Sequence, residues 1–136
     1  MLEDWILKKK EVEASKSKLR GVDLSNAKLM GAKLDGADLT QADLTSAYLI
    51  KADLSKASLV DADLTQAVLS EANLLDADLD GAELMDSFLH GANLKGVVNL
   101  TCDQIELANK AFQYCIEKKW PIFLVHMEIR LDISHL

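Results

Sequence analysis

The sequence predicts an all-β solenoid, and three regularities within residues 19–96 support that prediction. Leucine recurs at every fifth residue, without interruption, from Leu19 to Leu94. A small residue stands two positions before each leucine from Ala27 onward, and it is alanine everywhere except at Ser87. Glycine, asparagine or aspartate often stands two positions after the leucine. A short unit that repeats in this way is typical of a chain that winds into stacked coils.

The five-residue period argues against both a straight helix and a straight strand. In an α-helix, five steps of about 100° would place successive leucines about 140° apart, so they would spiral around the axis. In a strand, an odd period would turn alternate leucines to opposite faces. Alanine and leucine two residues apart point the same way in extended chain, so a turn after each leucine must restore the inward direction. Turns favour glycine, asparagine and aspartate, and these occupy that position at Asn26, Gly31, Gly36, Asp61, Asp76, Gly81, Asp86, Gly91 and Gly96.

Residues 37–41 (ADLTQ), 42–46 (ADLTS) and 52–56 (ADLSK) resemble the pentapeptide-repeat family, whose consensus is A(D/N)LXX. The resemblance extends over about 80 of the 136 residues. It implies a right-handed quadrilateral β-helix of about four coils, with four pentapeptides in each coil of about twenty residues. Positions twenty residues apart should then lie in columns along the outside of the stack.

The segments on either side of the repeat predict caps. Residues 1–18 predict an N-terminal helical cap, in which Leu2, Trp5 and Ile6 form an apolar patch. The repeat domain is assigned to residues 19–98, although the alanine-x-leucine phase is lost from residue 97. Residues 99–120 predict a C-terminal capping helix that begins with a capping box of Thr101 and Gln104.

Residues 121–136 predict a C-terminal strand extension, because apolar and polar residues alternate along them. Its apolar side consists of Val125, Met127, Ile129, Leu131 and Ile133. Such a strand needs a partner, because an unpaired apolar strand promotes aggregation.

One predicted column on the outside of the solenoid is apolar. From residue 22 onward, the residue between alanine and leucine should point outward, and it is apolar or aromatic only at Tyr48, Val68 and Phe88. Met30 and Ile50, each directly after a leucine, fall on the same predicted side. These five residues are the candidate face for binding a partner or for docking the chain's own tail, and the sequence leaves both occupants open.

A neighbouring column should hold Asp23, Asp43, Asp63 and Glu83. We interpret it as a solvated ladder whose carboxylates accept hydrogen bonds from nearby backbone N–H groups. The alternative is DNA mimicry, because the resemblance includes family members that occupy the DNA site of a type II topoisomerase such as DNA gyrase. Three features weigh against that alternative: the rod is short, leucine occupies every central inward position, and lysines interrupt the acidic surface.

Charge and composition narrow the function. The chain has a formal net charge of −7, and residues 21–96 alone carry −8, which argues against direct nucleic-acid binding. Cys102 and Cys115 form no CxxC pair, and His90, His126 and His135 belong to no catalytic or zinc pattern. The sequence therefore predicts no catalytic, cofactor-binding or metal-ligating residue.

We expect a cytoplasmic protein, because no stretch approaches the ~20 apolar residues of a membrane span and the N-terminus lacks the pattern of a signal peptide. The predicted role is a non-enzymatic protein–protein interaction or scaffold module with another protein as partner. A homodimer through the apolar face or the C-terminal extension is one form of that expectation.

Overall fold

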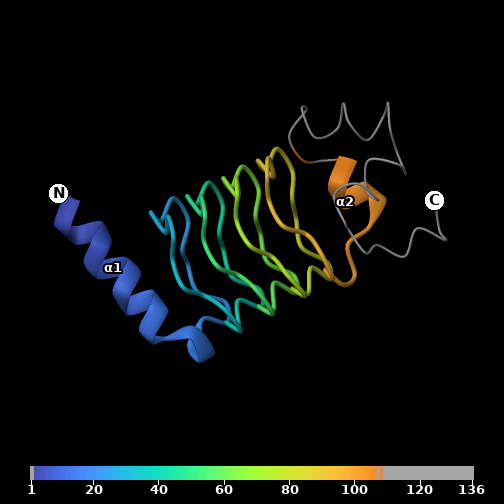
Figure 1. The fold of residues 1–136 in the computed structure, drawn as a ribbon. Coiled ribbons are helices and arrows are strands. Elements are labelled where there is room, and N and C mark those ends of the chain that lie inside the picture. The colour runs from blue at the N-terminus through green and yellow to red at the C-terminus, as the bar shows by residue number, and fades with distance from the viewer. Residues whose placement is uncertain (1, 107, 109–136) are drawn as a thin grey trace.

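The computed structural model describes residues 2–106 and 108 of the chain (Figure 1). Helix α1 (Leu2–Ala14) and the 3-10 helix η1 (Lys16–Lys18) precede a stack of coils, and helix α2 (Cys102–Glu106) follows it. The coils run side by side from α1 to α2 (Figure 1). The predicted strand extension of residues 121–136 lies outside the described residues.

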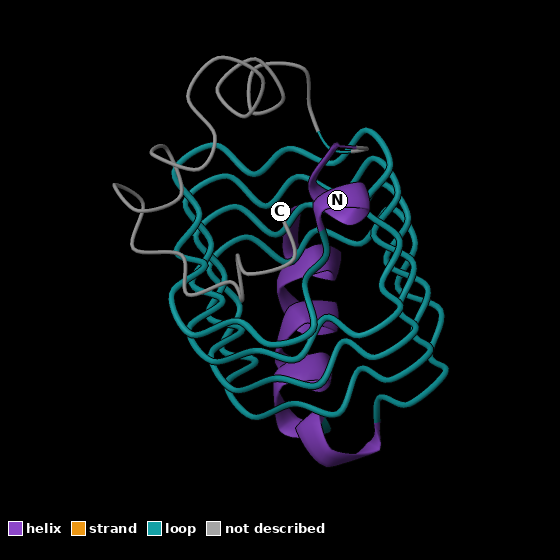
Figure 2. Cartoon of the chain, turned by 90° about the vertical axis from the view of Figure 1, so that its right-hand side faces the viewer, coloured by secondary structure: helices purple, strands orange, loops and turns teal. Residues whose placement is uncertain are grey.

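Parallel β-bridges join residues that are twenty positions apart, from Asp23↔Asp43 to Asp78↔Val98. The bridges form four columns, which begin at Asp23, Lys28, Lys33 and Asp38. This is the spacing that four pentapeptides per coil require. Viewed along the stack, successive coils lie over one another (Figure 2).

Backbone hydrogen bonds link each coil to the next on all four sides. The N–H of Leu24 donates to the carbonyl of Asp43 at 2.8 Å, and the N–H of Asp43 donates to the carbonyl of Val22 at 2.9 Å. The same two bonds recur in each column. The side walls of the solenoid therefore have their backbone polar groups satisfied, as burial against a neighbouring coil demands.

Every fifth residue, from Gly21 to Gly96, forms a corner with left-handed backbone and φ between 55° and 71°. The N–H of the next residue closes a turn, as where Ala27 donates to the carbonyl of Leu24 at 3.1 Å. A type II turn requires such a positive φ at its third residue. The predicted turn positions are therefore confirmed, and side chains as large as those of Gln41 and Lys51 also adopt this backbone.

The interior consists of leucine and alanine in close contact. Every leucine of the repeat from Leu24 to Leu94 is at most 2% exposed. The alanines two positions earlier, from Ala32 to Ala92, are at most 3% exposed. Alanine and leucine thus both point inward from each extended segment, as the spacing of two predicts.

Helix α1 crosses the middle of the coil outline at the N-terminal end (Figure 2). Val12 is 4% exposed and belongs to the core cluster of the solenoid. Of the predicted apolar patch, Ile6 is 40% exposed and Trp5 is half-buried, so Val12 makes the contact with the core.

At the other end, the predicted capping box is present. The backbone N–H of Thr101 donates to Oε1 of Gln104 at 2.7 Å, and the N–H of Gln104 donates to Oγ1 of Thr101 at 3.2 Å. Nε2 of Gln104 also donates to the carbonyls of Leu79 and Ala82, at 2.7 and 2.9 Å. Ile105 is fully buried beside them. One side chain therefore caps its own helix and two carbonyls of the last coil.

The ladder continues to Val98, the last residue of the assigned repeat domain, although the sequence phase is lost from residue 97. Val97 is 2% exposed in the alanine position, and Val98 pairs with Asp78. Within the predicted segment 99–120, helix α2 begins at Cys102, directly after Thr101 of the capping box. The remainder of the predicted 99–120 helix, at 107 and beyond 108, lies outside the described residues.

Ser87 occupies a position that is alanine in the pentapeptides around it. It is fully buried, and its Oγ has no hydrogen-bond partner among the described residues. An unpaired buried hydroxyl costs about 1–3 kcal/mol. We therefore expect Ser87→Ala to raise the free energy of unfolding by about 1 kcal/mol, measured by chemical denaturation.

Ala67→Ser is the matched control, because Ala67 lies one coil earlier in the same column and is also fully buried. It should lower the free energy of unfolding by a similar amount. A loss of stability in Ser87→Ala would contradict the prediction and indicate that the hydroxyl has a partner.

Candidate interaction face

The structure stacks the three outward apolar residues of the predicted face. Bridges join Tyr48 to Val68 and Val68 to Phe88. Tyr48 is 44% exposed and Phe88 is 41% exposed, while Val68 between them is half-buried. We call Tyr48, Val68 and Phe88 the apolar column. It begins one coil into the stack, because Lys28 holds the same position in the first coil.

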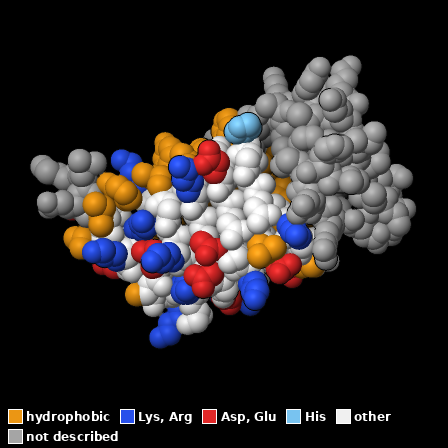
Figure 3. All heavy atoms as spheres, in the orientation of Figure 1, with side chains coloured by type: hydrophobic (Ala, Val, Ile, Leu, Met, Phe, Trp, Pro, Cys, Tyr) orange, Lys and Arg blue, Asp and Glu red, His pale blue; other side chains and the backbone are white. Residues whose placement is uncertain are grey.

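Met30 and Ile50, the other two predicted members, lie on the same wall beside the apolar column. Each directly follows the central leucine of its pentapeptide, and both are half-buried. The exposed His90 continues this row toward the C-terminal end. Figure 3 shows hydrophobic side chains gathered along the upper edge of the solenoid and over α1, with charges of both signs elsewhere on that face.

Within the coils, two exposed large apolar residues were not part of the predicted face. Met85 is 49% exposed on the wall of the acidic residues, and Val98 is 47% exposed at the end of another column. Each lacks an apolar neighbour in its column among the described residues. Single exposed apolar residues are common on protein surfaces, so the stacked arrangement distinguishes the apolar column.

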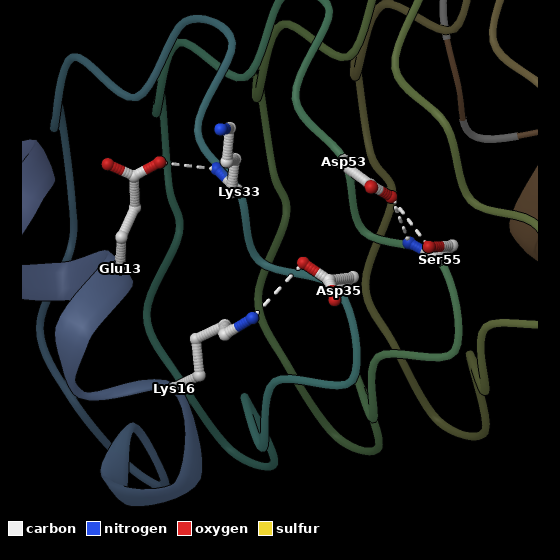
Figure 4. Close-up of polar contacts among 6 residues, drawn as sticks. All are labelled: Glu13, Lys16, Lys33, Asp35, Asp53 and Ser55. Carbon is white, nitrogen blue, oxygen red and sulfur yellow. Dashed lines mark hydrogen bonds and ion pairs between the residues drawn. The ribbon is translucent and has the colours of Figure 1, made fainter.

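The predicted acidic column is also stacked, because bridges join Asp23, Asp43, Asp63 and Glu83 in order. Its aspartates turn onto their own backbone: Oδ1 accepts a hydrogen bond from the N–H two residues later, at 2.9–3.0 Å. The same bond recurs in the other columns at Asp38, Asp53, Asn73, Asp78 and Asn93. Figure 4 shows it between Asp53 and Ser55. This contact matches the solvated-ladder interpretation.

These hydrogen bonds favour the ionised carboxylates. The hydroxyl and backbone N–H of Ser25 hold the pKa of Asp23 below its ordinary value. Burial raises the pKa of Asp63, but hydrogen bonds from Thr65 and Thr45 outweigh it, so the net shift of that pKa is also downward. Asp23 and Asp63 thus both favour the ionised form.

Polar contacts also tie the N-terminal segment to the first coil (Figure 4). Oε2 of Glu13 accepts the backbone N–H of Lys33 at 2.7 Å. Nζ of Lys16 lies 3.1 Å from Oδ1 of Asp35, and this contact lowers the pKa of the Asp35 carboxyl. The ion pair is partly exposed, and exposed pairs contribute little stability.

The described part of the chain offers no metal centre, because none of its histidine, cysteine, aspartate and glutamate residues gather in groups of three or more that could hold an ion. Its helices α1 and α2 are too short or too polar to cross a membrane.

A family model for pentapeptide repeats matches the chain with eight copies over residues 11–45, 23–61, 47–84 and 62–98. The chain belongs to the pentapeptide-repeat family. Proteins of this family fold as right-handed quadrilateral β-helices, and the twenty-residue bridge spacing agrees with that architecture. A comparison with curated proteins finds no match.

Several solved structures resemble the chain. A pentapeptide repeat protein from the thylakoid lumen of Arabidopsis thaliana is 29% identical, with 77% of this chain and 79% of that chain covered and a TM-score of 0.48. HetL, involved in heterocyst differentiation regulation in the cyanobacterium Nostoc sp. strain PCC 7120, is 30% identical, with 61% and 57% covered and a TM-score of 0.37. A pentapeptide repeat protein from the cyanobacterium Cyanothece 51142 is 38% identical, with 61% and 56% covered and a TM-score of 0.38. The matched part thus spans little more than half the length of the two cyanobacterial proteins.

The lowered pKa values of Asp23 and Asp63 predict a loss of stability in acid. A carboxyl whose pKa is lower in the folded state stabilises the fold above its unfolded pKa, and that contribution disappears as pH falls through the folded value. Unfolding midpoints should therefore decrease between about pH 5 and about pH 2. Asp23→Asn with Asp63→Asn should flatten this decrease, because the amide oxygen still accepts the backbone bond but does not titrate.

The control is Asp23→Ala with Asp63→Ala, which removes the acceptor as well. It should lower the unfolding midpoint at neutral pH by more than the asparagine variant does, because asparagine loses the charge but still accepts the backbone hydrogen bond. An unchanged slope between about pH 5 and about pH 2 in the asparagine variant would show that other carboxyls govern the acid response.

Proposed function

We propose that this protein is a non-enzymatic scaffold, a capped solenoid of about four coils whose apolar column binds another protein. Pentapeptide repeat proteins are in general structural or interaction modules rather than enzymes. The proposal for this chain rests on one observation: Tyr48, Val68 and Phe88 stack on an outward wall and two of them are more than two-fifths exposed.

Aromatic side chains suit this role because they bury a large area on binding, and tyrosine adds a hydroxyl for hydrogen bonding. The wall that carries them is held by backbone hydrogen bonds on both sides, as where Tyr48 pairs with Ala27 and Leu49 with Val68. A partner would therefore meet a preorganised surface, so little chain entropy is lost on binding.

The surroundings of the apolar column resemble the rim of an interface. Nζ of Lys51 lies 3.6 Å from Oε2 of Glu71 at the adjoining corner, and both side chains are exposed. Interfaces commonly place apolar residues at the centre and charged residues at the edge. A second copy of the chain could present the same wall across a two-fold axis, so self-association is one form of the proposal.

Tyr48→Glu with Phe88→Glu should abolish partner binding, because two charges would be buried at the centre of the interface. Affinity capture with subsequent mass spectrometry measures binding to another protein, and analytical ultracentrifugation measures self-association. We expect the loss of at least one specific partner or a lower sedimentation coefficient.

The matched control is Leu75→Glu with Met85→Glu, which places the same charges at two apolar positions outside the apolar column. This control should keep the partner and the sedimentation coefficient of the original protein. If the Tyr48 and Phe88 variant is folded and behaves like the control in both measurements, the apolar column is not an interface.

DNA-mimicking modulation of a type II topoisomerase is a second candidate, and the stacked acidic column supports it. A row of carboxylates at intervals of about 4.8 Å could engage a cationic DNA-binding surface. Two features oppose it. One oxygen of each aspartate already accepts a hydrogen bond from the local backbone. The acidic surface is also interrupted by Lys28, Lys33, Lys51 and Lys56.

A gyrase supercoiling assay separates the two candidates. We expect neither inhibition nor protection from a quinolone when the protein is added at micromolar concentration. Inhibition that disappears in an Asp23, Asp43 and Asp63 triple asparagine variant would favour DNA mimicry over the scaffold proposal.

A further inference from the structure

The first coil has an edge that no other coil covers. Inside the stack, the N–H of each outward residue donates to the coil before it, as Asp43 does to Val22 and Tyr48 does to Ala27. The corresponding donors of the first coil belong to Asp23, Lys28, Lys33 and Asp38. They face the N-terminal end, where only α1 and η1 lie among the described elements (Figure 1).

The N-terminal segment satisfies half of these donors. Glu13 accepts the N–H of Lys33, and the carbonyl of Lys16 accepts the N–H of Asp38 at 2.8 Å. The N–H groups of Asp23 and Lys28 have no partner within residues 2–106 and 108. Figure 2 shows the reason, because α1 crosses the middle of the outline and the walls of the coils pass on either side of it.

The carbonyls of the same stretch are open as well. In the second coil, the carbonyls of Asp43 and Tyr48 accept from Leu24 and Leu29 at 2.8 Å. Their counterparts in the first coil, on Asp23 and Lys28, receive no backbone hydrogen bond from the described residues. The walls at Asp23 and at Lys28, with the corner at Asn26 between them, thus each present a donor and an acceptor in the pattern of an unpaired strand edge.

Two lysines lie at this edge. The Lys28 side chain is exposed and stands in line with the apolar column. Nζ of Lys9 lies 3.9 Å from the place that a Cβ would take on Gly31. The only carboxylate in the stretch, that of Asp23, is occupied by the hydroxyl and N–H of Ser25. Residues 1–20 carry a net charge of +2, in contrast to the −8 of residues 21–96.

We propose that the edge on the Lys28 wall binds an extended, acidic peptide segment of another protein by strand addition. The peptide continues the bridge pattern of the coils, so that one of its residues stands to Lys28 as Lys28 stands to Tyr48. Main-chain hydrogen bonds to the N–H and the carbonyl of Lys28 provide the affinity. Acidic side chains beside Lys28 and Lys9 provide the preference for a negatively charged sequence.

This site differs from the apolar column in place and in chemistry, so either can fail without the other. The apolar column recognises side chains on a wall whose backbone is already paired. The edge recognises the backbone of its ligand. The Phe88→Glu variant, which changes the apolar column three coils away from Lys28, should therefore bind an edge ligand as well as the original protein does.

The test uses the full chain and a fluorescently labelled synthetic peptide of about eight residues, in which glutamate alternates with valine. Fluorescence anisotropy measures its binding. We expect saturable binding that weakens by about tenfold or more in Lys28→Pro, because proline has no N–H to donate. Lys28→Glu should weaken binding to a similar extent through repulsion, whereas Lys51→Glu, at a corner of the next coil, should change it little.

A second peptide, methylated at alternate backbone nitrogens, separates strand addition from simple charge attraction. We expect it not to bind, because methylation removes its donors. Absence of saturable binding by the unmodified peptide would overturn the proposal, as would equal binding of both peptides. Circular dichroism establishes whether Lys28→Pro is folded. If it is folded and binds normally, the edge is not the site, and if it is unfolded, Lys28→Glu and the methylated peptide decide the question.

Discussion

The left-handed backbone at every fifth residue is the constraint on which the rest of the structure depends. Each such corner turns the chain after a leucine, so that the next alanine again points inward. This left-handed backbone costs about 1–2 kcal/mol for a residue with a side chain. Gln41, Lys51 and Glu71 nevertheless adopt it. The interior contacts and the turn hydrogen bond at each corner offset it, and the solenoid results from their repetition.

A regular interior leaves the outside to distinguish this protein from others with the same repeat. The leucine and alanine side chains must fit the narrow space between the walls, so these positions tolerate little change in side-chain volume. Outward positions meet solvent, and there a single column holds lysine, tyrosine, valine and phenylalanine. Half of the bridged outward residues are Asp or Asn, because the side chains of those two types accept a hydrogen bond from the local backbone. The three residues of the apolar column cannot make that bond.

Sequence reasoning predicted well the features that depend on the spacing of residues alone. The period of five defines the corners, and the outward register gives the stacking of Tyr48 on Val68 once twenty residues form a coil. It predicted poorly the features that depend on how separate elements meet. That Val12 rather than Ile6 turns inward depends on the angle of α1, and the bonds from Gln104 to Leu79 and Ala82 join residues more than twenty positions apart. No local pattern encodes such contacts.

The same division separates the walls of the solenoid from its ends. On a wall, the backbone groups are hydrogen-bonded to neighbouring coils, so recognition of a partner there must come from side chains such as Tyr48 and Phe88. At an end, the ladder stops and its backbone groups need partners from elsewhere. Glu13, Lys16 and Gln104 supply some of them, each by a contact outside the repeat. Because a repeat cannot terminate itself, its caps decide which edge groups are closed and which stay available to a ligand.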